Sequence, residues 1–378
     1  MAPRLRLALA LALALVLLAS GASAASVGDT CSSEGDCGAG LHCSDCGGGG
    51  DKTCTRAKPI DPLTHGTGLP FNNYSWLTTH NSYALAGSSS ATGSALITQT
   101  NQEDTITAQL KNGVRGLMLD TYDFNNDVWL CHSFQGKCFN FTAFQPAINV
   151  LKEIRTFLDV AKMPKSGGDW PLLKDMISQN ERLLVFTSKK SKEASEGIAY
   201  EWSYVVENQY GNEGMVEGKC PNRAESPAMD SKSQSLVLMN FFTTDPSQTG
   251  VCANNSAPLV SMLKTCHDLS GNRWPNYIAV DFYMRSDGGG APLATDIANG
   301  HLVCGCDNIA YCKANSTFGT CVIPPPSPPP SPRKAPSGGK GTGAGGSSSS
   351  SGAMARVVLP KLSFFFGVAL LILVILSY

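Results

Sequence analysis

The chain has 378 residues, a formal net charge of −1 and fourteen cysteines. With a charge near zero and no basic run, the sequence gives no support for nucleic-acid binding or for strong attraction to an anionic membrane. The even number of cysteines, all outside the two terminal apolar segments, indicates a disulfide-bonded secreted protein.

The first segment is typical of a secretory signal peptide. Arg4 and Arg6 precede an apolar stretch at residues 7–18, and small residues at 21–24 offer a cleavage site after Ala24 or Ala25. We therefore expect residues 1–24 to be removed as the chain enters the secretory pathway.

Residues 25–60 are predicted to form a small cysteine-rich module. Its five cysteines crowd a glycine-rich segment that is too small to hold itself together without crosslinks. Because five is odd, one of them must pair outside the module or stay free. Cys43 and Cys46 form a C-x-x-C pattern, so zinc is the competing interpretation, but an oxidising compartment favours disulfides.

Three short apolar runs then end in polar residues suited to acid-base chemistry. The runs occupy residues 75–82, 113–123 and 127–132, and Asn125 and Asn126 are predicted to form a turn between the last two. Each reads as a strand, the second after a predicted helix at residues 105–112. Their ends carry His80 with Asn81, Asp120 and His132. A histidine or aspartate at the end of a single strand is more often structural. Three such strand ends favour a shared site, because α/β barrels carry their catalytic groups at the carboxyl ends of their strands.

Longer motifs around these residues resemble a known family. The motifs are LTTHNSY, NGVRGLMLDTYDF, VWLCHSF and RWPNYIAVDFYMRSDGGGAPLATDIANGHLVCGCDNI. They resemble those of plant proteins that carry a phosphatidylinositol-specific phospholipase C X domain, from about residue 61 to residue 321. The resemblance implies an α/β fold of the TIM-type (β/α) barrel class over residues 61–322, distorted, which cleaves the phosphodiester of an inositol lipid.

The resemblance also implies a role for three residues. His80 matches the histidine that assists attack by the inositol 2-hydroxyl, and His132 matches the histidine that protonates the leaving alkoxide. Two such groups are needed because the attacking and leaving oxygens lie on opposite sides of the phosphorus. Asp281, in a predicted last strand at residues 278–283, would orient the ring of His80.

A calcium site is a further implication of the resemblance. Asn81 and Asp120 match metal-binding positions of animal relatives, but Met118 stands where those enzymes carry another acidic ligand. Calcium prefers six to eight oxygen ligands, so we expect a complete site only where Asp123 or waters replace the missing oxygen.

Two basic residues are candidates for supporting the substrate or the metal. Lys189 follows a predicted strand at residues 182–188 and would meet phosphate charge at the same end of the fold. The alternative for Lys189 is an exposed loop lysine. Arg285, four residues after Asp281, is the second candidate.

Residues 145–188 depart from the alternation of strand and helix in a barrel. Helical spacing covers residues 145–160, and residues 170–179 also read as a helix, with no strand between them. Family members usually carry an additional strand and helix after the position of Asp159, and that strand ends in acidic residues close to the active site. We therefore predict that one βα unit is missing and that the sheet is open or less stable there.

The end of the chain is typical of a glycosylphosphatidylinositol (GPI) attachment signal. A Pro/Gly/Ser stalk at residues 323–352 precedes a signal at residues 353–378, with Ser351 as the predicted attachment residue. The alternative is a membrane-spanning helix, but no basic segment follows the tail. We expect a monomer on the extracellular face of the plasma membrane.

Sequons and further cysteines fit the same compartment. Cys131 and Cys138 are a predicted local pair that braces the loop after His132, and the cysteines at 304, 306, 312 and 321 form a second knot of undetermined connectivity. The four N-glycosylation sequons, predicted to be exposed, are Asn73, Asn140, Asn254 and Asn315.

The leading hypothesis is a cell-surface phosphoric diester hydrolase acting on a phosphoinositide or GPI-type substrate, with calcium as the candidate cofactor. The alternative is a non-catalytic surface protein that binds inositol phosphates, glycolipids or wall polymers through the same cleft, favoured by the missing unit and by Met118. A glycerophosphodiester phosphodiesterase would need two close carboxylates for a metal after the first histidine, and Met118 replaces the first of these.

Overall fold

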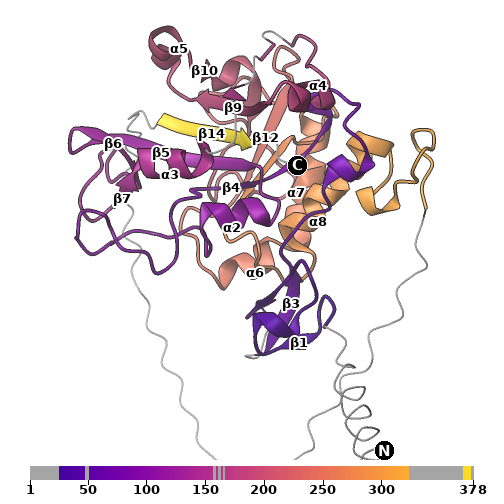
Figure 1. Cartoon of the computed structure of the whole chain (residues 1–378), viewed down its shortest axis with the longest axis horizontal. Coiled ribbons are helices and arrows are strands. Elements are labelled where there is room, and N and C mark those ends of the chain that lie inside the picture. Colours follow the sequence, from indigo (N-terminus) through magenta and orange to yellow (C-terminus); the bar gives the residue numbers. More distant parts are fainter. Residues whose placement is uncertain are drawn as a thin grey trace, which may run out of the picture.

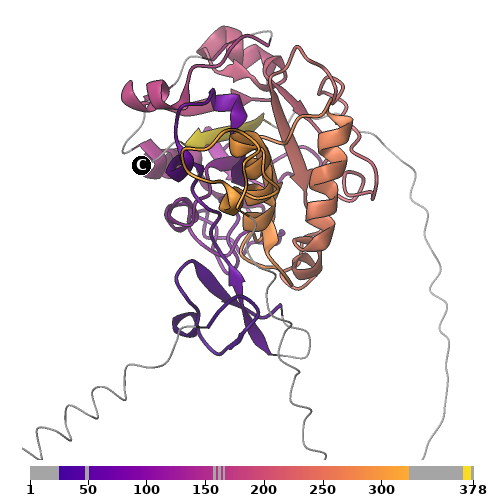
Figure 2. The ribbon, with the colours of Figure 1, turned by 90° about the vertical axis from the view of Figure 1, so that its right-hand side faces the viewer.

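The computed structural model describes residues 25–46, 51–155, 159–160, 163–164, 167–322 and 369–375. The predicted signal peptide, the stalk and Ser351 lie outside these residues. The fold is mixed α/β, with one large sheet of eleven strands and a small sheet of three strands that lies to one side of the main body (Figure 1; Figure 2). Among the described helices, none is long and apolar enough to cross a membrane.

The small sheet belongs to the N-terminal module. Its antiparallel strands are β1 (Thr30–Cys31), β3 (Lys52–Arg56) and β2 (Leu41–Ser44), in that spatial order. Two disulfides, Cys31–Cys43 and Cys37–Cys54, close the module, and the fifth cysteine, Cys46, pairs with Cys252 of the main body. The prediction that one cysteine leaves the module is confirmed, and disulfides occupy all five of the cysteines for which zinc was the competing interpretation.

Five parallel strands form the centre of the large sheet. In spatial order they are β5 (Gly116–Phe124), β4 (Trp76–Thr79), β13 (Tyr277–Val280), β12 (Leu236–Phe241) and β11 (Val205–Glu207). Their side chains alternate between two apolar clusters, as strand geometry requires. One cluster packs against helices α2 (Ile106–Lys111), α3 (Ala147–Arg155), α7 (Ala257–Leu269) and α8 (Gly290–Asn299).

The strand that ends before His132 is part of a hairpin. β6 (Asp127–Cys131) runs antiparallel to β5, and β7 (Ala143–Pro146) runs antiparallel to β6. Asn125 and Asn126 take φ values of 50° and 58°, which suit the two central residues of a type I′ turn. The turn and the strand were predicted, but the expectation of three neighbouring barrel strands was wrong at this point: His132 enters from the antiparallel partner of β5.

The region of the predicted missing unit has short elements. It contains β8 (Asp159–Val160), α4 (Leu173–Ser178), β9 (Glu181–Thr187), α5 (Lys190–Glu196) and β10 (Ala199–Tyr200). The predicted helix at residues 145–160 ends at Arg155, and the two-residue strand β8, parallel to β9, lies where we expected none.

A C-terminal strand stands between β5 and β9. β14 (Ala369–Ile375) pairs antiparallel with both, whereas an alternating barrel would place a parallel strand there (Figure 1). The absence of one βα unit after the position of Asp159 stays a prediction. The strand order is an open path from β10 to β11, so the described residues form a large central sheet and do not show a closed barrel.

The remaining crosslinks and short helices complete the described chain. The disulfide Cys131–Cys138 is present as predicted, and the second knot is resolved as Cys304–Cys312 and Cys306–Cys321. Cys220–Cys266 joins the loop after β11 to α7. The short helices are η1 (Glu34–Asp36), η2 (Pro62–His65), η3 (Phe71–Asn73), η4 (Glu201–Ser203), α6 (Gly250–Asn254), the π-helix η5 (Gly300–Cys304) and η6 (Ile309–Tyr311).

Candidate active site

Strand periodicity brings four polar residues to one end of the sheet. Trp76, Met118, Leu238 and Ala279 point into the same inner apolar cluster. Side chains on a strand return to the same face every second residue, so the next inward positions beyond this layer include His80, Asp120, Asn240 and Asp281. Because the strands are parallel and paired in register, these positions lie together at the carboxyl ends of β4, β5, β12 and β13.

His80 and Asp281 form a hydrogen-bonded pair. The Nδ1 atom of His80 lies 2.9 Å from Oδ1 of Asp281, which is buried. The Nδ2 group of Asn101 donates to the same carboxylate oxygen at 2.9 Å. Burial raises the pKa of Asp281, while the nearby His80 and the hydrogen bonds from His80 and Asn101 oppose this rise. A carboxylate in this position holds the Nδ1–H tautomer of His80 and leaves Nε2 as the proton acceptor.

Asn81 connects the two histidines. Its Nδ2 atom lies 3.1 Å from Nε2 of His80 and 3.4 Å from Nδ1 of His132. One amide group spans the gap, so the two imidazoles face a common space. The Oδ1 atom of Asn81 is buried and has no hydrogen-bond partner among the described residues.

His132 lies in an apolar setting. The rings of Tyr83 and Phe144 are 6.0 and 5.7 Å from its ring, and its Nε2 atom is buried without a partner in the described part of the chain. Burial and, to a smaller extent, the nearby His80 lower the pKa of His132 to about 3, while a hydrogen bond with the backbone of Gln99 opposes this fall. His132 is therefore neutral at neutral pH, and a bound anion would raise its pKa because opposite charge favours the protonated form.

Phe242 fixes the orientation of His80. The two rings stack with centroids 3.6 Å apart and an angle of 6° between their planes. Phe242 follows β12 and has the same inward parity as Asn240. Neither Phe242 nor Asn101 was among the predicted site residues. The alternation of β12 could have indicated Phe242, whereas Asn101 lies in a loop without periodicity and gave no signal.

Asp120 lies at the half-buried end of the inward face of β5. Burial raises its pKa to about 6, and the charges of His80 and Arg223 oppose this rise. The structure thus places Asp120 within electrostatic range of one histidine and of an arginine that the sequence prediction missed.

Arg223 is a cation close enough to this end of the sheet to act on Asp120. It forms an ion pair with the buried Glu207 at 3.1 Å and another with Glu225 at 3.0 Å. Its guanidinium carbon lies 5.1 Å from the ring centroids of both Trp202 and Tyr210. The long loop after β11 delivers Arg223, which explains why strand patterns did not reveal it.

The two predicted basic residues lie elsewhere. Lys189 is half-buried before α5, where its backbone N–H donates to Oγ1 of Thr187 at 3.2 Å. The guanidinium of Arg285 donates to both carboxylate oxygens of Glu103 at 2.7 Å and forms an ion pair with Asp45 of the N-terminal module. No contact joins either residue to the histidines among the described residues.

The residues present do not fit a complete calcium site. Asn81 and Asp120 supply oxygens, but the side chain of Met118 packs into the inner cluster and Asp123 is exposed further along β5. Calcium needs six to eight oxygens. Among the described residues, two groups of side chains have ligand atoms close enough together to hold a metal ion. They are Cys31/Cys37/Cys43 and Cys46/Cys252/Asp287, and their cysteines all form disulfides.

The predicted glycosylation positions differ in exposure. Asn140 and Asn315 are exposed, whereas Asn73 and Asn254 are half-buried. The expectation that all four positions are exposed is therefore correct for only two of them.

Comparison with known proteins identifies the family. Residues 161–292 match the PI-PLC X family model, a range that includes Asp281 and leaves out both histidines. A PI-PLC X domain-containing protein of Arabidopsis thaliana is 48% identical over 331 residues, which cover 78% of each chain. PI-PLC X domain-containing protein 1 of Arthroderma benhamiae is 22% identical over 235 residues, which cover 50% of this chain and 76% of that protein. No solved structure matches the chain. The chain belongs to the PI-PLC X domain family.

Proposed function

We propose that the protein is a phosphoric diester hydrolase that cleaves an inositol phosphodiester by acid-base catalysis with His80 and His132. The observation that carries the proposal is the chain of contacts from Asp281 through His80 and Asn81 to His132, with distances of 2.9, 3.1 and 3.4 Å. Family membership supports the reaction class. The strands would form an incomplete barrel, and the terminal signals favour action at the cell surface through a GPI anchor.

The geometry gives each residue a task. Asp281 holds the Nδ1–H of His80, so Nε2 can take the proton of the attacking inositol hydroxyl. The negative phosphodiester raises the pKa of His132, which then donates its proton to the leaving alkoxide. Asn81 bridges the histidines and would turn its amide to the phosphate oxygens when the substrate enters. No step depends on a metal ion.

The test uses the full-length protein and vesicles that contain phosphatidylinositol. Release of water-soluble inositol phosphate is compared between wild type, His80→Ala and His132→Ala, with calcium and with a chelator. His65→Ala, an exposed histidine in η2, is the matched control. We expect each site variant to lose turnover by roughly a hundredfold or more, as expected for the loss of a general acid or base. Turnover that survives in both site variants would contradict the proposal.

A non-catalytic binding role is the second candidate. The observation in its favour is that His132 is neutral with a buried Nε2 atom and that Met118 leaves the neighbouring carboxylate set incomplete. A folded wild type that binds inositol phosphate in calorimetry but releases no product would establish this role in place of the enzyme.

A further inference from the structure

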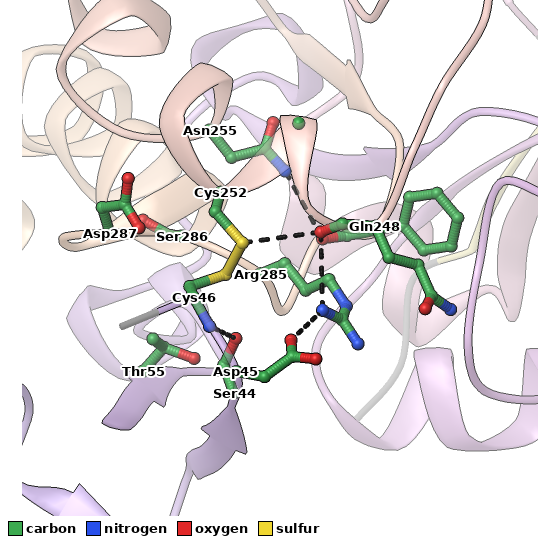
Figure 3. Close-up of a disulfide and its surroundings, with 12 residues drawn as sticks. Ser44, Asp45, Cys46, Thr55, Gln248, Cys252, Asn255, Arg285, Ser286 and Asp287 are labelled. Carbon is green, nitrogen blue, oxygen red and sulfur yellow. Dashed lines mark hydrogen bonds and ion pairs between the residues drawn. A yellow bond between two sulfur atoms is a disulfide. The ribbon is translucent and has the colours of Figure 1, made fainter. Parts of the chain in front are cut away.

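The N-terminal module is bonded to the segment that follows β13 and to the helix packed against it. Cys46 is bonded to Cys252, and Asp45 forms an ion pair with Arg285 (Figure 3). Oγ1 of Thr55 also donates to the backbone oxygen of Met284 at 2.8 Å. All three contacts reach residues within or packed against the segment 281–287, which begins with the carboxylate that holds His80.

This segment contains an unfavourable backbone conformation. Phe282 has a φ of 44°, a conformation that a bulky residue keeps only where the surrounding structure holds it. Its N–H donates to the backbone oxygen of Asn101 at 2.7 Å, and its own oxygen accepts from the N–H of Arg285 at 2.8 Å. The position of Asp281 therefore depends on the groups that fix the residues after it.

Asn255 is the contact between the disulfide and this segment. Its buried Nδ2 group donates to the backbone oxygen of Asp281 at 2.9 Å and lies 3.4 Å from that of Phe282. Asn255 directly follows α6, the helix that carries Cys252. The backbone oxygen of Cys252 also accepts from the N–H of Asp287 at 2.9 Å. The disulfide thus holds the helix that fixes both ends of the segment.

We propose that the N-terminal module is a clamp that positions the His80–Asp281 pair, with Cys46, Cys252 and Asn255 as positioning residues. This inference rests on the proposed function, because it assigns the module to the same site. Two of the three disulfides of the module already close it internally. The third spans 206 residues of sequence and joins the module to the helix behind Asp281.

The module therefore acts through alignment and not through contact with the substrate. A misplacement of about 1 Å can cost roughly a hundredfold in rate. Loosening the clamp should lower kcat and change the imidazole NMR chemical shifts of His80, while substrate binding through other groups keeps KM nearly constant.

The experiment compares two pairs of substitutions in the full-length protein. Cys46→Ser/Cys252→Ser opens the clamp, and Cys31→Ser/Cys43→Ser is the matched control that removes a disulfide inside the module. The readouts are kcat and KM on phosphatidylinositol vesicles and the imidazole NMR chemical shifts of His80, which report its hydrogen bond to Asp281. We expect the clamp variant to lose roughly 10- to 100-fold in kcat, with KM within about twofold and changed chemical shifts for His80. The control should keep both readouts.

Asn255→Ala is a second variant that leaves every disulfide in place, and it should show the same pattern in weaker form. Unchanged kcat and unchanged His80 chemical shifts in both Asn255→Ala and the clamp variant would overturn the proposal, and so would an equal loss in the control. The His80 chemical shifts can be measured in a protein without turnover, so failure of the proposed reaction and failure of the clamp give different results.

Discussion

Asp120→Asn tests the electrostatic account of the site. Burial raises the pKa of Asp120 from 3.8 to about 6, so the native state holds this proton more tightly than the unfolded chain does. The contribution of Asp120 to stability is complete below pH 3.8 and is lost as the pH rises through 6. At higher pH the native state must hold a carboxylate that burial disfavours, and asparagine removes that cost.

The size of the effect follows from the pKa. Each pKa unit corresponds to about 1.4 kcal/mol, so a rise from 3.8 to about 6 corresponds to at most about 3 kcal/mol. Because Asp120 is half-buried and partly reaches water, we expect Asp120→Asn to gain about 1–3 kcal/mol above pH 7. The gain should vanish near pH 3.5.

The assay is urea unfolding of wild type and Asp120→Asn across this pH range, with and without calcium. Calcium should leave both midpoints unchanged, because the available oxygens do not complete a site. A gain that is equal at low and high pH would refute the electrostatic reasoning. If calcium raises the urea midpoint of the wild type but not that of Asp120→Asn, the protein has a calcium site that includes Asp120.

Three further perturbations test other parts of the structure. Because the pKa of His132 is lowered from 6.5 to about 3, its contribution to stability is complete above pH 6.5 and is lost as the pH falls toward 3. In His132→Gln the midpoint of urea unfolding should therefore change less between pH 4 and 7 than in the wild type. An equal dependence of the midpoint on pH in both proteins would contradict this. Deleting residues 362–378 removes β14, as attachment of a GPI anchor would also do; if β14 belongs to the folded protein, the unpaired edges of β5 and β9 should give a lower melting temperature in calorimetry and self-association in size-exclusion chromatography, whereas unchanged values would favour a cleaved attachment signal. Phe242→Ala frees the ring of His80 and should lower kcat by roughly tenfold with little change in KM; equal kcat in the variant would exclude a positioning role for the stack.

The sequence was sufficient to predict the pair at the centre of the site. His80 and Asp281 follow short buried strands, β4 and β13, and strand parity with parallel register brings their side chains together. The turn at Asn125 and Asn126 could also be predicted, because asparagine tolerates the positive φ that both central residues of a hairpin turn adopt here. Strand alternation and turn residues are local patterns, so the sequence alone is enough to predict these features.

Other parts of the site depend on contacts between distant segments. Arg223 and Asn101 lie in loops, and only the packed chain brings them near Asp120 and Asp281. The partner of Cys46 is 206 residues away, so the count of cysteines predicted an external bond but could not name Cys252. Arg285 shows the opposite error: its short distance from Asp281 in sequence suggested a site role, whereas its charge is used at the module interface.

The predicted absence of one βα unit concerns one side of the site. β14 lies beside the end of β5, where Leu370 faces Asp120 and Ile372 faces Met118 across the strands. β4 and β13, which carry the histidine–aspartate pair, meet each other on the far side of β5 through four register pairs. The resemblance to the family implies acidic residues close to the site on the strand that is predicted to be missing. The absence of that strand, together with Met118, would therefore leave fewer carboxylates near the site, while His80 and Asp281 keep their neighbours. The contacts among His80, Asn81 and His132 do not depend on those carboxylates.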